Sequence, residues 1–443
     1  KKSHTLSMDL TIKKPLAEKP PYSQIAMAYG RSILAGGKLP PGDFSHLDVL
    51  EREQRDLLLK RSAALGPIFK GLIENRLAVC VIGNAIGQRV LRTNSRALRP
   101  VSIELNTLFP QGFMRQMEGD CHRKYRSLLA QGINDFDVTA LAPQFERIVS
   151  NALDGFADQK KSDAYQWSAT LSKITTDFLL LLFFGVSPGG RTQEQLRLAY
   201  NNLGPNGVVW YIKDRQVSAF AALREEIQGL LTNTEQHSSP GLVQKMAGSG
   251  AVDETMLGNL IYMVELGRYD LRGLFRWIAK YAAENTVWLD KIAAEEDRDG
   301  SLAEAFVLEV LRMDQSERLM RNVIEDFSFE GFFIPRGALL RIGMWEAHKD
   351  SQNFPDPFHF DPGRHLSHER LGERFSPFGL DHHHCPFATL SIRLASLFLR
   401  VLARDYKISM PGGDFAVRGA YHWEPSPDFT INLQPLAAIR HGR

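Results

Sequence analysis

Two kinds of hydrophobic spacing alternate along this chain. Apolar residues alternate with other residues between Gly66 and Gly83, which predicts two strands of a small sheet. Between about residues 113 and 330 the apolar positions recur every three or four residues, which predicts a mostly helical region. Residues 325–342 and 405–435 return to short strand-like runs. We therefore expect a mainly α protein with small β-sheets, in which a β-rich part at about residues 60–100 precedes the helical core.

The longest helical pattern runs from Met256 to Glu284. At about 100° per residue, one side of this helix carries mostly apolar positions, namely Met263, Leu266, Gly267, Asp270 and Leu274. The other side carries Glu265, Arg268, Arg272 and Arg276. Glu265 and Arg268 are three residues apart and can pair along the helix, so we expect these arginines to be structural. Asp270 is then the one charged side chain that the helix presents on its apolar face.

Cys385 precedes another helical pattern, in which apolar residues recur from Phe387 to Leu402. Pro386 suits the first helical position, so we predict that Cys385 is the N-cap of this helix. The helix dipole and the unpaired N–H groups there favour a thiolate over a thiol. A thiolate in a loop ahead of a buried helix is suited to be an axial haem ligand. The alternative is a buried and inert core cysteine.

Glu309 and Arg312 form a second chemical signal ahead of the cysteine. They lie three residues apart in a helical stretch, so their carboxylate and guanidinium can meet on one face. A Pro-rich loop from Phe354 to Arg364 follows. An isolated pair of this kind usually lies at the surface and contributes little to stability. Its position before a cysteine loop is what makes it informative.

These elements together resemble the cytochrome P-450 family. That family's haem-binding loop reads Phe-x-x-Gly-x-x-x-Cys-x-Gly, and here Phe378 and Cys385 match, whereas Asp381 and Phe387 replace the two glycines. The family also carries Glu-x-x-Arg, closed by an arginine from a Pro-rich loop, and Glu309, Arg312 and Arg364 match those three positions. Between them, the family has a hairpin where this chain has Gly331 to Gly337. The resemblance covers about residues 60–435.

The resemblance implies a cytochrome P-450 fold and a haem b cofactor (iron protoporphyrin IX). The haem would be sandwiched between the central long helix and a Cys-ligand loop at 375–387, within a single domain over 1–443. Cys385 would be the axial ligand of the iron. The basic residues that match the family's propionate-binding positions are His122, Arg126, Arg321 and His383. Cationic donors have a physical role there because two buried carboxylates require charged partners.

The central helix departs from the family's pattern. Its oxygen-activating stretch reads Ala/Gly-Gly-x-Asp/Glu-Thr, in which the acid and the alcohol relay protons at a helix kink. Here Tyr269 replaces the acid and Asp270 replaces the threonine, while the kink glycine remains as Gly267. The usual proton relay is therefore absent. Asp270, Tyr269 and Gly267 are the candidate catalytic residues, and Asp270 would deliver protons directly or through water.

Composition agrees with a globular enzyme. The chain has 443 residues, is 44% hydrophobic and carries a net charge of +2, so nothing suggests nucleic acid or an anionic membrane as a partner. Three cysteines argue against a disulfide framework and suit a reducing cytoplasm. We see no run of eighteen apolar residues, and Phe178 to Gly185 is expected to be a buried helix end. We expect a cytoplasmic protein of the soluble bacterial type.

The run from His382 to Cys385 could be mistaken for a zinc site. Adjacent residues point in different directions, however, and zinc ligands are usually separated by two or more residues. In the family, the region around the Gly204 to Gly207 break is a mobile lid over the substrate. Residues Met313 to Met320 are polar where the family's pocket is usually apolar, which suits either a polar substrate or surface exposure of that segment.

Three functions remain open at this stage. The first is monooxygenation of a small natural-product intermediate, with a ferredoxin-type electron donor and an unusual proton supply. The second is a haem-thiolate peroxygenase, isomerase or dehydratase that needs no dioxygen activation. The third is a non-catalytic partner protein, which ranks last because such relatives typically lose the cysteine. Consumption of reduced nicotinamide would support the first function, and turnover with peroxide or substrate alone would support the second. Absence of haem would support the third.

Overall fold

A computed structural model of the chain describes residues 21–101, 105–159, 163–204, 212–232, 240–294, 300–314, 319–366, 374–410, 416–418 and 423–436. The helices are α1 (Tyr22–Leu34), α2 (Leu47–Leu50), α3 (Leu57–Leu65), α4 (Asn84–Thr93), α5 (Gly119–Asn134), α6 (Ala142–Ala157), α7 (Ala164–Phe184), α8 (Arg191–Leu203), α9 (Asp214–Thr232), α10 (Leu242–Gly248), α11 (Glu254–Glu284), α12 (Thr286–Ala293), α13 (Ser301–Met313), α14 (Met344–Ala347) and α15 (Ala388–Asp405).

The strands are short. They are β1 (Ile68–Ile73), β2 (Arg76–Ile82), β3 (Leu98–Pro100), β4 (Leu319–Val323), β5 (Phe327–Phe329), β6 (Phe332–Ile334), β7 (Leu339–Gly343), β8 (Tyr406–Ser409), β9 (Ala416–Arg418), β10 (Trp423–Pro425) and β11 (Asn432–Pro435). The expected mainly α fold with small sheets is confirmed.

The largest sheet has five strands in the order β1-β2-β7-β4-β3. The first two are the strands expected between Gly66 and Gly83, and they pair antiparallel around a turn in which Glu74 and Asn75 both have positive φ. Asn tolerates that conformation better than most residues, which favours the tight turn. The hairpin expected at Gly331 to Gly337 is shifted, because its turn lies at Glu330 and Gly331, between β5 and β6.

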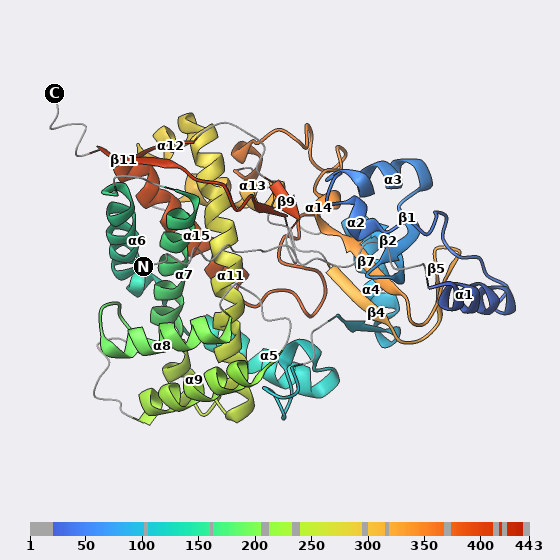
Figure 1. Cartoon of the computed structure of the whole chain (residues 1–443), viewed down its shortest axis with the longest axis horizontal. Coiled ribbons are helices and arrows are strands. Elements are labelled where there is room, and N and C mark those ends of the chain that lie inside the picture. The colour runs from blue at the N-terminus through green and yellow to red at the C-terminus, as the bar shows by residue number, and fades with distance from the viewer. Residues whose placement is uncertain are drawn as a thin grey trace, which may run out of the picture.

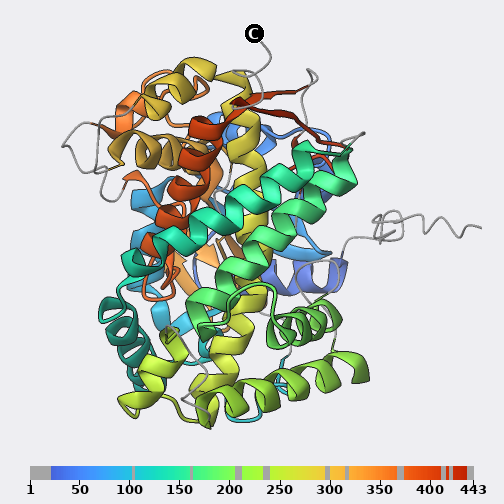
Figure 2. The same ribbon diagram turned by 90° about the vertical axis from the view of Figure 1, so that its left-hand side faces the viewer.

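The helices gather on the other side of the molecule, around α11. Figure 1 shows α11 running through the helical half beside α7, with the five-stranded sheet and α1 to α4 at the opposite end, and Figure 2 shows the helical half from its own side. The Asp253 side chain caps α11 by accepting a hydrogen bond from the Met256 N–H at 2.8 Å, so the helix begins two residues earlier than its apolar pattern indicated.

Helix α7 contains the apolar run from Phe178 to Phe184 and ends at Gly185, which has the left-handed conformation. By length and composition, α7 is the one described helix that could cross a membrane, but 72% of its apolar window is buried inside the protein. Every residue from Thr175 to Phe184 is buried. The run is a buried helix end, as the sequence predicted. The break at Gly204 to Gly207 lies almost wholly outside the described residues.

Candidate active site

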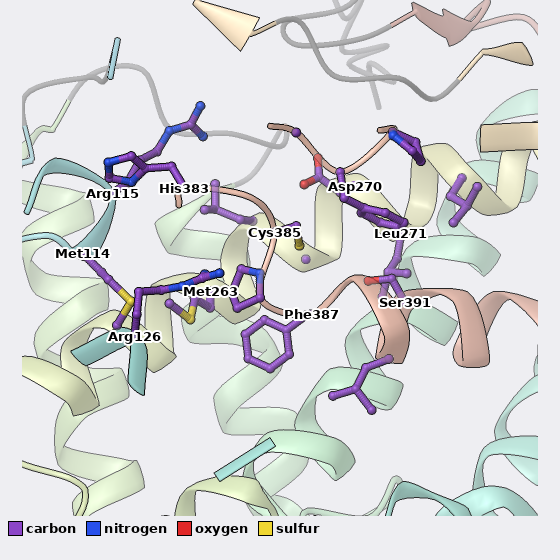
Figure 3. Close-up of a pocket in the computed structure, with 18 of the residues that line it drawn as sticks. Met114, Arg115, Arg126, Met263, Asp270, Leu271, His383, Cys385, Phe387 and Ser391 are labelled. Atoms are coloured by element: carbon purple, nitrogen blue, oxygen red, sulfur yellow. The ribbon is translucent and has the colours of Figure 1, made fainter. Parts of the chain in front are cut away.

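A cavity of about 260 Å³ separates the middle of α11 from the loop that carries Cys385. Figure 3 shows Asp270 and Cys385 among the side chains that line this cavity. The residues from α11 that line it are Met263, Leu266, Gly267, Asp270, Leu271 and Leu274. Those from the cysteine loop and the start of α15 are Pro377, Phe378, Gly379, His383, Cys385, Pro386, Phe387, Leu390, Ser391 and Leu394. The helix face deduced from spacing is therefore the face that meets the cavity.

Cys385 is held in its loop by a backbone hydrogen bond, in which its N–H donates to the Phe378 carbonyl at 2.9 Å. The expected N-cap position is wrong. Helix α15 starts at Ala388, because its first helical hydrogen bond runs from the Ser391 N–H to the Phe387 carbonyl. Cys385 thus lies two residues before the N-cap, beyond the closest reach of the helix N–H groups. The helix N-terminus therefore does not account for a thiolate at Cys385.

Asp381 explains one departure from the family's loop pattern. It adopts φ +66°, the left-handed conformation that glycine takes without strain and that Asp tolerates. Its carboxylate accepts hydrogen bonds from the His383 N–H at 2.7 Å and from the Arg321 guanidinium at 2.9 Å. Asp381 therefore replaces the glycine conformation and adds a brace for the loop. Phe387 has φ −101°, where a side chain is unstrained.

Basic side chains gather at one edge of the cavity. His122, Arg126, Arg321 and His383 all line it, although they come from α5, β4 and the cysteine loop. His122 and Arg321 are each only 4% exposed. Sequence reasoning missed a fifth such residue, Arg115, which also lines this edge. It lies in a short 3-10 helix (Met114–Gln116), where a single arginine has no distinguishing spacing.

This edge fits the two carboxylates of a haem. The His383 Nε2 atom is buried and makes no hydrogen bond within the described residues, and its nearest carboxylate, that of Glu118, lies 3.7 Å away. Burial lowers the pKa of His383 to about 2 and that of His122 to about 4, with nearby positive groups adding to the effect. Burial also lowers the pKa of Arg126, and the charge of Cys385 opposes that shift. Both histidines are therefore neutral near pH 7, and the positive charge at this edge comes from arginines such as Arg126.

The histidine run does not act as one metal cluster. His384 turns outward, where its carbonyl accepts a hydrogen bond from Arg126 at 3.0 Å. His382 and His383 instead approach Glu118, and their possible ligand atoms lie within 4.8 Å of one another. Because His383 also lines the cavity, its imidazole belongs with the haem-edge group. The expected divergence of adjacent side chains holds for His384, whereas His382 and His383 lie close together.

Of the three catalytic candidates on α11, Asp270 and Gly267 line the cavity and Tyr269 does not. Asp270 lines the cavity and, among the described residues that do so, is the one carboxylate. Gly267 also lines it, and a Cβ there would lie 3.2 Å from Leu179, so glycine permits the close approach of α11 to α7. Tyr269 is a correction, because its hydroxyl contacts the Glu424 carboxylate on β10 and it does not appear in the cavity wall. Successive residues of a helix point about 100° apart, so the Tyr269 side chain points away from the direction of Asp270.

Glu309 is the centre of a buried charge network beside α15. Arg312 donates two hydrogen bonds to its carboxylate, both at 2.8 Å, and both side chains have 0% exposure. Arg364 donates to the same carboxylate at 3.1 Å. Sequence reasoning missed His365, whose Nε2 lies 2.9 Å from Glu309. The expected three residues thus meet, and a fourth joins them.

The polar segment after Arg312 does not form a polar cavity wall where it is described. Asp314 is 2% exposed, and its carboxylate contacts Arg55 and Tyr281. Residues 315–318 lie outside the described part of the chain. The cavity is lined at this point by Leu311, Leu319 and Arg321. The distal wall is therefore largely apolar, apart from Asp270.

A profile of the family described as Cytochrome P-450 matches residues 297–417. That segment contains Glu309, Arg312, Arg364 and Cys385. Among curated relatives, a cytochrome P-450 of Zea mays is 24% identical over 71% of this chain and 68% of its own length. An abscisic acid 8'-hydroxylase of Oryza sativa is 22% identical over 85% of this chain and 82% of its own. An ent-kaurenoic acid oxidase of Hordeum vulgare is 23% identical over 75% and 74%.

Solved structures give the same fold. A cyanobacterial protein with bound retinoic acid matches with a TM-score of 0.69 and 20% identity, and the match covers 90% of this chain and 100% of that one. A zebrafish cytochrome P-450 with abiraterone matches with a TM-score of 0.65 and 17% identity, covering 86% and 98%. The arrangement of helices and sheets is therefore that of a known fold.

Proposed function

Because the chain belongs to the cytochrome P-450 family, we propose that it is a haem-thiolate monooxygenase in which Asp270 supplies protons for dioxygen activation. Members of the family are haem-iron proteins and oxidoreductases, mostly monooxygenases, and this assignment covers the present chain. The proton source is the part that is particular to this protein. The observation that carries it is the position of Asp270 in the cavity wall that faces Cys385.

Cys385 would hold the haem iron from the loop side. His122, Arg126, Arg321 and His383 would hold the haem carboxylates at the cavity edge. When bound, the haem supplies the iron at which dioxygen is activated, and a thiolate ligand favours cleavage of the O–O bond. The Cys385 N–H bond to Phe378 and the Asp381 brace fix the loop that presents the sulfur. The apolar residues of α11 exclude water from the opposite wall.

Asp270 has the chemistry that the missing threonine relay would have provided. Monooxygenation inserts one oxygen atom of dioxygen into the substrate and releases the other as water, which consumes two electrons and two protons. A carboxyl group that lines the cavity can hold a proton and donate it directly or through one water. Tyr269 does not take this part, because its hydroxyl is engaged with Glu424.

We propose a largely apolar substrate that carries an acid group. The cavity walls support the apolar part, since Leu179, Leu182, Phe183, Leu311 and Phe113 all line it. The relatives support the acid group, because by name they act on abscisic acid and ent-kaurenoic acid. Arg115, at the edge of the same cavity, is a suitable partner for a carboxylate. In this proposal Arg115 binds the polar group of the substrate, in place of the polar pocket segment considered from the sequence.

Family members use redox partners, and for this chain we propose a ferredoxin-type electron donor and a cytoplasmic location. Three cysteines without a disulfide pattern support a reducing compartment. The test of the donor is simple. Haem-loaded protein should accept electrons from reduced nicotinamide through a ferredoxin and its reductase, and no reduction of the iron by that pair would reject the proposal.

The proton supply is tested by Asp270→Asn, which keeps the volume and removes the acid. We expect product formation with the ferredoxin pair to fall at least about tenfold, below the usual range for general acids. Tyr269→Phe is the matched control, since it removes a neighbouring hydroxyl that faces β10, and it should retain turnover. Full activity in Asp270→Asn refutes the proton role. Turnover driven by peroxide alone and unaffected by the substitution would favour the peroxygenase alternative.

A further inference from the structure

We propose that Arg268 is a positioning residue that couples the end of helix α8 to the turn of α11 carrying Asp270. The inference rests on the proposed function, because it concerns the placement of the proton-supplying acid. Arg268 lies two residues before Asp270 and on the opposite side of the helix. It therefore cannot enter the cavity itself. What it can do is determine where this turn of α11 lies.

The Arg268 guanidinium joins three helices. Its Nη2 donates to the Asn201 Oδ1 atom on α8 at 2.7 Å. Its Nε donates to the Thr176 hydroxyl on α7 at 3.1 Å, and its Nη1 donates to Glu265 on α11 at 2.9 Å. The guanidinium presents its donors on three nitrogens in a fixed planar fork, so it reaches acceptors on three helices that a lysine, whose three donors share one atom, would not span. An ion pair within α11 would require only Glu265, so the contacts with α7 and α8 are additional.

Helix α7 forms a firm support for this turn. Gly267 packs against Leu179, where a Cβ would approach to 3.2 Å. Thr176 is three residues before Leu179, so the glycine contact and the Arg268 contact lie on one face of α7. Thr176 is itself only 2% exposed. The turn is thus held from behind by α7, and a shift of Arg268 along this support would carry Asp270 with it.

The α8 side of the contact is tied to α9. Arg215, in the first turn of α9, donates from Nε to the Asn202 carbonyl at 3.1 Å and from Nη2 to the Asn201 carbonyl at 3.3 Å. The same turn of α8 also meets α11 through Tyr200, whose hydroxyl donates to the Ile261 carbonyl at 3.1 Å. A displacement of the end of α8 therefore reaches Arg268 through Asn201. The path is a contiguous series of hydrogen bonds, which makes it open to a coupling test.

The electrostatics favour a single arrangement. Glu265 is 1% exposed, and burial raises its pKa to about 7, against which the Arg268 charge acts. A buried carboxylate needs this partner, so Arg268 is not free to swing toward solvent without leaving it unpaired. When Asn201 moves, Arg268 and the helix turn must follow or lose a charged hydrogen bond. Contact with α8 is in this way transmitted to the Asp270 turn.

The experiment uses carbon monoxide on the reduced, haem-loaded protein, because the C–O stretching frequency reports charge and hydrogen bonding beside the iron. Asn201→Leu removes the acceptor on α8 at an exposed helix end, and Arg268→Lys keeps the charge but loses the fork. Asn202→Leu is the matched control, since its carbonyl rather than its side chain meets Arg215. Urea unfolding of each variant checks that the fold is retained.

We expect Asp270→Asn to shift the C–O band, Asn201→Leu and Arg268→Lys to shift or broaden it, and Asn202→Leu to leave it unchanged. In the Asp270→Asn background, Asn201→Leu should add no further shift. Wild-type bands in both Asn201→Leu and Arg268→Lys, beside a shifted band in Asp270→Asn, would overturn the coupling alone. An unshifted band in Asp270→Asn would overturn the placement of the acid, and the coupling with it.

Discussion

Arg312→Leu removes the central partner of the Glu309 carboxylate, and we expect it to abolish stable haem binding. Arg312 donates to Glu309 and also to three backbone carbonyls, those of His348 at 3.0 Å, Pro357 at 2.7 Å and His359 at 3.1 Å. These carbonyls belong to the chain between α14 and the cysteine loop. A leucine is apolar and shorter, and it satisfies none of them. The loss therefore reaches the segment that leads to Cys385.

The magnitude follows from the carboxylate. Burial alone would raise the pKa of Glu309, but hydrogen bonds from Arg312 and His365 bring it from 4.5 to about 2. At about 1.4 kcal/mol for each tenfold change in proton affinity, the network favours the ionised carboxylate by roughly 3 kcal/mol. Breaking a buried pair from one side costs about 3–5 kcal/mol. Because domains are stable by only about 5–15 kcal/mol, this is a large part of the total.

The assay is urea unfolding together with haem content after purification. Arg404→Leu is the matched control, because Arg404 pairs with Glu146 and Asp405 at the surface and its side chain is 51% exposed. A surface pair of this kind contributes about 0–1 kcal/mol. Arg312→Lys should fall between the two, since it keeps the charge without the bidentate geometry. A soluble, haem-replete Arg312→Leu protein with wild-type unfolding would refute the reasoning.

Three other predictions concern the cysteine loop and its support. Cys385→Ala should remain folded but lose the red-shifted carbon monoxide band, and an unchanged band would remove Cys385 as the iron ligand. Asp381→Ala should destabilise the protein by about 1–2 kcal/mol and lower haem retention, because it loses the hydrogen bonds to Arg321 and to the His383 N–H at a left-handed position. Asp381→Asn should retain most of the stability and most of the haem. Equal behaviour of the two variants would contradict this. Burial, with the charges of Lys349 and Arg312, holds the pKa of His348 well below 6.5. The unfolded chain therefore binds a proton at this histidine more readily than the folded protein does. The resulting stabilisation is complete above about pH 6.5 and is lost as the pH falls below it. His348→Gln should make the decline in urea midpoint from pH 7.5 to 5.5 shallower, and an equally steep decline would exclude this histidine.

Much of the site follows from spacing along the chain. Phe378 and Cys385 occur at a fixed separation in one loop, and Glu309 and Arg312 lie one helical turn apart, so neither relation depends on distant parts of the fold. The face of α11 that meets the cavity also follows from the 3.6-residue period, which placed Met263, Gly267 and Asp270 together. These are local relations, and local geometry is what a sequence pattern encodes.

The remaining features required the tertiary structure, because they are set by contacts between residues far apart in the chain. Tyr269 turns to Glu424, which no helical wheel could indicate, and α15 starts at Ala388 because of where backbone hydrogen bonds begin. Arg115 reaches the haem edge from a 3-10 helix too short to show a periodic pattern. Arg268 meets Asn201 across 67 positions and changes from a structural arginine to a candidate link between helices. The sequence by itself determined relations within one helix or loop, such as that of Glu309 to Arg312, whereas the packing of α7, α8 and α11 decided which distant residues meet, because only folding brings them together.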